Sequence, residues 1–131
     1  LFAHIYLDPA HMPRQVMLQW NDGTWEHRAY WGENLIAWGT DNTVSRQYMG
    51  PLPPPGRWVR LEVPAATVGV EGRIVNGMAF TLFDGPATWD RAGKRALQPV
   101  GSGEQDASAP ALLFTGGTLD FISVIDPAIG V

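Results

Sequence analysis

Apolar and polar residues alternate along most of the chain, and this period of two predicts β-strands. Turn pairs such as Asp8-Pro9, Asp22-Gly23 and Asp84-Gly85 separate the alternating runs. A single helical turn is expected over residues 64–69, where proline stands first. The pattern predicts strands over residues 1–7, 15–20, 24–31, 43–49, 57–63 and 73–83, with 87–90 as the hairpin partner of the last. About eight short strands between turns predict an all-β fold, an antiparallel β-sandwich or jelly roll.

The size and composition of the chain fit a single β-sandwich domain over residues 1–131, with 45% hydrophobic residues. Residues 96–111 are small and polar and are expected to form a mobile loop or linker, whereas residues 112–131 are candidate closing strands. The chain opens on Leu1 in the middle of a strand-like pattern, so we interpret it as part of a larger multidomain chain.

Composition excludes several classes of function. The chain has no cysteine, which rules out disulfides, thiolate metal sites and thiol nucleophiles. Its net charge is −4 and its arginines are scattered, so it lacks the basic stripe that nucleic-acid binding requires. No apolar run is long enough to span a bilayer, and membrane insertion is not expected.

The aromatic-rich stretch WNDGTWEHRAYWG, residues 20–32, raises the question of whether its rings bind a ligand or fill a core. A two-residue type I′ turn at Asp22-Gly23 would pair Trp20 with Trp25 and sort the side chains onto two faces. The candidate core face carries Val16, Leu18, Trp20, Trp25, His27 and Ala29. The opposite face carries Gln15, Met17, Gln19, Glu26, Arg28 and Tyr30. These polar groups suit a polyhydroxylated ligand, and the alternative is a solvated face with a Glu26–Arg28 ion pair.

The loop that follows, residues 32–50, adds a second group of candidates. Trp38 stands outside any clear strand and is followed by Asp41 and Tyr48. A ring that stacks on the apolar face of a sugar, beside polar groups for the hydroxyls, suits carbohydrate recognition. The alternative is that Trp38 anchors the loop at the rim of the sandwich. The candidate ligand-binding residues are therefore Glu26, Arg28, Tyr30 and Trp38, and after them Trp31, Asp41 and Tyr48.

The stretch GRWVRLEVPAATVGVEGRIVNGMAFTLFDGPATWDRAG (56–93), together with WNDGTWEHRAYWG, resembles a known kind of module. It is similar to galactose-binding-like, carbohydrate-binding-module jelly-roll accessory domains of large bacterial exported and cell-surface proteins, over residues 1–95. The resemblance implies a glycan ligand bound on a concave sheet face or edge loops, and an extracellular or cell-surface location. It also implies a structural calcium ion in many members, for which Asp8 and Asp90 are the candidate ligands. Calcium needs six to eight oxygens, so we favour turn roles for Asp8 and Asp84.

Signals for catalysis are weak. His4, His11 and His27 lack metal-ligand spacing, and no nucleophile elbow, phosphate-binding loop or dinucleotide motif is present. Glu26 and Glu33 would lie on opposite faces of a regular strand, which argues against a glycosidase pair. We therefore expect a non-catalytic, secreted module that binds a polysaccharide or oligosaccharide by aromatic stacking and hydrogen bonding.

Two alternatives remain. One is a structural spacer or adhesion domain of a surface protein, in which the face of Glu26, Arg28 and Tyr30 is covered. The other is a small metal-dependent enzyme acting on polysaccharides, whose ligands His4 and His27 would meet across the sheet.

Overall fold

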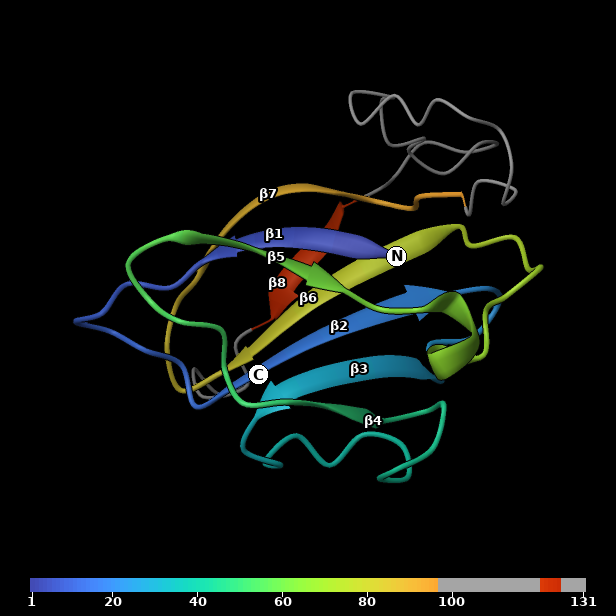
Figure 1. Ribbon diagram of the computed structural model, residues 1–131. Helices are drawn as coiled ribbons and strands as arrows, with labels where there is room; N and C mark the ends of the chain where they lie inside the picture. The colour runs from blue at the N-terminus through green and yellow to red at the C-terminus, as the bar shows by residue number, and fades with distance from the viewer. Residues whose placement is uncertain (97–120, 126–131) are drawn as a thin grey trace.

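The computed structural model describes residues 1–96 and the backbone of residues 121–125, and in them two β-sheets face each other (Figure 1). The smaller sheet has the strand order β5-β1-β7, formed by β1 (Phe2–Tyr6), β5 (Trp58–Glu62) and β7 (Thr88–Gly93). The larger sheet has the order β4-β3-β2-β6-β8, formed by β2 (Gln15–Asn21), β3 (His27–Gly32), β4 (Gln47–Gly50), β6 (Gly77–Phe83) and β8 (Phe121–Ile125). A 3-10 turn, η1 (Ala65–Val68), matches the helical turn expected after Pro64.

The predicted all-β sandwich is confirmed. Most neighbouring strands run antiparallel, but β4 pairs parallel with β3, and β8 pairs parallel with β6. Of the candidate closing strands over residues 112–131 the structure describes the backbone of β8, and residues 97–111 of the expected loop lie outside the described part. No helix in the described part is long and apolar enough to cross a membrane.

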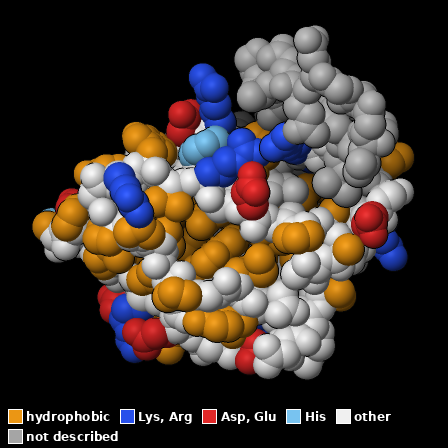
Figure 2. Space-filling model, in the orientation of Figure 1, with side chains coloured by type: hydrophobic (Ala, Val, Ile, Leu, Met, Phe, Trp, Pro, Cys, Tyr) orange, Lys and Arg blue, Asp and Glu red, His pale blue; other side chains and the backbone are white. Residues whose placement is uncertain are grey.

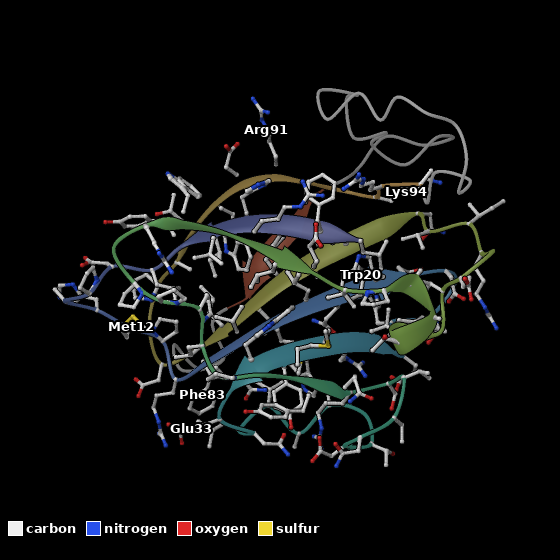
Figure 3. The ribbon with its side chains drawn as sticks, viewed as in Figure 1. Met12, Trp20, Glu33, Phe83, Arg91 and Lys94 are labelled. Atoms are coloured by element: carbon white, nitrogen blue, oxygen red, sulfur yellow. The ribbon has the colours of Figure 1, made fainter. Side chains whose placement is uncertain are left out.

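The core lies between the two sheets. Alternate residues of β1, β2 and β5 point inward, as the period-two pattern predicts. On β2 these residues are Val16, Leu18 and Trp20, all fully buried, and Trp20 lies between the sheets in Figure 3. Burial of one such large side chain stabilises the fold by about 1.5–3 kcal/mol. The β5 face predicted to be apolar is likewise inside, with Leu61 4% and Val63 1% exposed.

The register of the β2–β3 hairpin differs from the prediction by two residues. Trp20 pairs with His27, not with Trp25, and a longer connection replaces the two-residue turn. The carboxylate of Asp22 accepts hydrogen bonds from His27 and Arg73. These contacts hold Asp22 in the longer connection and not in a two-residue turn. A slip of two keeps each β2 and β3 side chain on its predicted face. Trp25 now lies in the connection, half-buried against Gly77.

The strand near residue 88 belongs to the other sheet. The prediction that residues 87–90 pair with residues 73–83 is wrong, because β7 crosses over and pairs with β1. The crossing packs the Trp89 ring against Phe80 of the opposite sheet, with ring centroids 4.6 Å apart. It starts at Gly85, where φ is +154° and an added Cβ would lie 2.8 Å from the Pro13 backbone. A two-residue turn after Asp84 is therefore replaced by a connection between sheets.

Candidate functional site

The connection between β3 and β4, residues 33–46, folds back over the face of the five-stranded sheet that points away from the core. We call it the covering loop, and it runs along the lower side of the sandwich in Figure 1. Ile36 of this loop is 3% exposed and packs with Met17 and Tyr30 in a small apolar cluster of its own. The loop is thus fixed to the sheet by a hydrophobic plug at its start.

Hydrogen bonds from buried polar side chains fix the rest of the covering loop. The Gln15 side-chain oxygen accepts hydrogen bonds from the backbone N–H groups of Leu35 and Ile36, at 2.7 and 2.8 Å. The Arg46 guanidinium donates to the Ile36 carbonyl at 3.1 Å, joining the two ends of the loop. Because Gln15 is fully buried, these bonds form in a site shielded from water, where they are strong.

Arg28 is the charged centre beneath the covering loop. Its guanidinium donates to the Gln19 side chain at 2.8 Å, to the Ser45 carbonyl at 3.0 Å and to the Glu26 carboxylate at 3.0 Å. The Arg28 side chain is 7% exposed and that of Glu26 is 55% exposed, so the pair reaches from the interior to the surface. The hydrogen bond from Arg28 holds the pKa of Glu26 below its usual range. The ion pair expected in the alternative interpretation is present, but the face around it is covered by the loop and is not open to solvent.

Tyr30 forms a second polar cluster with the loop. Its hydroxyl donates to Asp41 at 2.8 Å, and the other oxygen of Asp41 accepts a hydrogen bond from the Asn34 amide at 3.0 Å. Burial, with the Asp41 carboxylate as the second cause, raises the pKa of Tyr30 to about 12. The Tyr30 ring also contacts the ring of Tyr48, the next residue across in β4, with centroids 5.3 Å apart.

The sequence-predicted residues therefore divide into three groups. Arg28 and Tyr30 lie beneath the covering loop, 6% and 3% exposed, so their side chains hold the loop and do not face solvent. Trp31 points the other way, into the core between the sheets, and is 7% exposed. The outward-facing rings are Trp38 and Tyr48, 39% and 44% exposed, with the partly exposed carboxylates Glu26 and Asp41 as polar neighbours of the network.

The sequence analysis placed Gln15 on the polar face but not as an anchor of the loop, and it did not select Asn34, Ile36 or Arg46. Signals in the sequence point to two of the four. Gln15 is a polar residue at the start of a strand that is apolar at its next three positions, and Ile36 is an apolar residue inside a polar loop. A buried glutamine needs partners, and loop backbone groups supply them.

The two candidate calcium ligands have other roles here. The Asp8 carboxylate accepts a hydrogen bond from the Ala10 N–H at 2.9 Å and lies 3.3 Å from the His11 ring, as a turn residue does. Asp90 accepts a hydrogen bond from the Arg91 N–H at 2.9 Å. Within residues 1–96, no three side chains of the metal-ligating kind converge. A calcium ion bound by these residues stays a prediction from the resemblance.

The two strand histidines are apart. His4 lies on β1 of the smaller sheet, whereas His27 lies on β3 of the larger one, so the expectation that they meet across one sheet is wrong. Both nitrogens of His27 have partners, the Val68 carbonyl at 2.6 Å and the Asp22 carboxylate at 2.9 Å. His27 thus joins β3 to η1 and does not complete a site with His4.

No known family model, curated protein or solved structure matches the chain. The likeness to carbohydrate-binding modules therefore rests on the sequence stretches alone.

Proposed function

We propose that this chain is a non-catalytic carbohydrate-binding module whose glycan lies on the outer surface of the covering loop. The observation that carries the proposal is that two rings are exposed, Trp38 at 39% on the covering loop, which is fixed from below, and Tyr48 at 44% on β4, the strand that follows it. Aromatic rings left open to water at a fixed place match the apolar faces of sugar rings. The proposal also includes an extracellular or cell-surface location, because the plant and microbial polysaccharides that such a module would bind lie outside the cell.

The buried network supports the proposal through preorganisation. Arg28, Tyr30 and Gln15 hold the loop backbone before any ligand arrives, which lowers the entropy lost when the ligand binds. Asp41, 34% exposed, and Asn34 have polar groups at the surface for sugar hydroxyls. In this proposal Arg28 and Tyr30 are positioning residues, and Trp31 acts only as core.

The first prediction concerns Trp38. We expect Trp38→Ala to weaken glycan binding about tenfold or more, equivalent to about 1.4 kcal/mol. The melting temperature should change little, because the ring is 39% exposed. The measurement is isothermal titration against a panel of plant and microbial polysaccharides, with Ile74→Ala as the control, since Ile74 is 83% exposed on another loop. A large loss of melting temperature would show that Trp38 is a structural anchor, and a folded wild type that binds no glycan would refute the proposal.

One observation favours a second candidate, the structural spacer or adhesion domain. That hypothesis requires a covered face at Arg28 and Tyr30, and the chain's own loop covers them. The same titration separates the two functions, because a spacer has no affinity for any glycan while its fold is intact. The enzyme alternative loses its residue pair, since His4 and His27 lie on different sheets.

A further inference from the structure

The outer face of the three-stranded sheet carries a second group of aromatic and polar side chains. The inward positions of β1 are Ala3 and Ile5, both fully buried, so the residues between them face outward. Across β1 and β5 the outward pairs are Tyr6 with Trp58, His4 with Arg60 and Phe2 with Glu62. Figure 2 shows charged side chains of both signs and a histidine side by side over these strands.

Trp58 is the open ring of this face. It is 51% exposed, although it stands within a strand. The Tyr6 ring packs against it at 5.8 Å between centroids with a tilt of 54°, which restricts the rotamers of the indole while half of its surface stays open. Phe2 differs, because the Arg60 guanidinium lies 4.0 Å from its ring centroid and Phe2 is only 4% exposed. Stacking space is therefore concentrated at Trp58.

The charged groups that follow Trp58 along β5 are paired with each other. Arg60 donates to Glu62 at 2.6 Å, so this pair is neutral as a unit. On β7, the strand on the other side of β1, Thr88 stands opposite Tyr6 and Asp90 stands opposite His4. Asp90 accepts a hydrogen bond from the Arg91 backbone N–H at 2.9 Å, while the Arg91 side chain points away from the sandwich in Figure 3. An open indole beside the neutral Arg60–Glu62 pair, whose guanidinium is already bound to a carboxylate, fits an uncharged polyhydroxylated ligand better than an anionic one.

We infer that the outer face of Trp58, Tyr6, His4 and Arg60 binds a neutral saccharide stacked on the Trp58 indole. This site is independent of the covering loop, because the loop lies on the five-stranded sheet and this face belongs to the three-stranded sheet. The outer faces of two packed sheets point in opposite directions. One extended sugar chain therefore occupies one face only, and a module with both sites holds two glycan chains together.

Indole N–H resonances test the inference directly, since the chain has six tryptophans and each gives its own signal. Trp58→Phe and Trp38→Phe assign the two signals of interest. The probes are soluble neutral oligosaccharides, namely gluco-, manno-, xylo- and galacto-oligosaccharides, added to the full chain. We expect a saturable shift of the Trp58 signal, whereas the signal of the fully buried Trp20 stays in place. Trp58→Ala should also weaken binding at this face about tenfold. The wild-type chain, with two sites, should precipitate a polymeric glycan, and the Trp58→Ala variant should not.

The outcomes separate this inference from the proposed function. A shift at Trp38 alone overturns the inference and leaves the loop site intact, while a shift at Trp58 alone does the reverse. A Trp58 signal that moves with protein concentration, without sugar, identifies an interface between copies and overturns the saccharide site. If neither signal moves with any of the oligosaccharides, both sites are refuted.

Discussion

The hydroxyl of Tyr30 donates a hydrogen bond of 2.8 Å to Asp41 beneath the covering loop. Burial and this carboxylate disfavour the phenolate, so the pKa of Tyr30 rises from 10.0 to about 12. The folded state therefore holds this proton where the unfolded state releases it. The stability that Tyr30 contributes is complete below pH 10.0 and is lost as pH rises towards 12.

An alkaline absorbance titration should resolve this group among the three tyrosines of the chain. We expect one phenol to titrate near pH 12 in the folded protein, and Tyr30→Phe to remove that component. Tyr30→Phe should cost about 1 kcal/mol of unfolding free energy, the usual net value of one hydrogen bond. Asp41→Asn is the matched control, which should lower the Tyr30 pKa in part because burial, the larger cause, remains. Tyr30 titrating near its ordinary value in the folded wild type would contradict its burial.

For single residues such as these, the sequence showed the chemistry of the side chain but not what surrounds it in the fold. Alternation placed Arg28 and Tyr30 on the face opposite the core, and the structure agrees. Alternation did not indicate that this face is covered, because the covering segment is a loop whose sequence has no regular hydrophobic periodicity. Trp31 is a different case, since parity along β3 already places it on the core face with Ala29, and only its aromatic chemistry made it a binding candidate.

The conformation of the covering loop depends on Gly39. Its φ is +76°, and an added Cβ would meet the Ser45 carbonyl oxygen and lie 2.8 Å from an Arg28 guanidinium nitrogen. The Ser45 carbonyl also accepts a hydrogen bond from Arg28, so the loop closes onto the guanidinium at this point. A side chain here would separate the loop from its charged anchor.

We therefore expect Gly39→Ala to destabilise the protein far more than Gly72→Ala. Gly72 has nearly the same φ, +71°, but nothing lies within 4 Å of its added Cβ. Its substitution should cost only the left-handed backbone penalty, about 1–2 kcal/mol. Urea unfolding of both variants measures the difference. Equal losses would mean that the loop does not press on Arg28, and would remove the argument for a preorganised binding surface.

The elements themselves were largely predictable, whereas their connections were not. Strand positions and inward faces follow from a period of two, which is local information. The hairpin register depends on Asp22, whose partner Arg73 lies 51 residues further along the chain. The place of β7 depends on packing between Trp89 and Phe80 across the sandwich. Such contacts between distant residues leave no signal in the local pattern.

In the whole molecule, Asp22 joins three separate segments at one end of the sandwich. It follows the last residue of β2, accepts from His27 of β3 at 2.9 Å and accepts from Arg73, before β6, at 2.7 Å. The other ring nitrogen of His27 is hydrogen-bonded to the Val68 carbonyl, which links this junction to η1. The Asp22 side chain is only 4% exposed and that of His27 is 8% exposed, so this contact is shielded from solvent, whereas Arg73 reaches Asp22 from the surface with 60% of its side chain exposed.

This junction should control acid unfolding. The hydrogen bond from Arg73, and then that from His27, lower the pKa of Asp22 from 3.8. A depressed folded-state pKa gives stability that is complete above the unfolded value and is lost as pH falls through the folded value. Asp8 and Glu33 also have lowered pKa values, but their side chains are each 53% exposed, so their ion pairs contribute little. We expect the melting temperature of the wild type and of Asp8→Asn to fall steeply below pH 3.8. Asp22→Asn should be less stable than the wild type at neutral pH, and its melting temperature should depend less on pH in this acidic range. Calorimetry across this range decides the matter, and parallel acid limbs for Asp22→Asn and the wild type would show that the junction carries no charge-dependent stability.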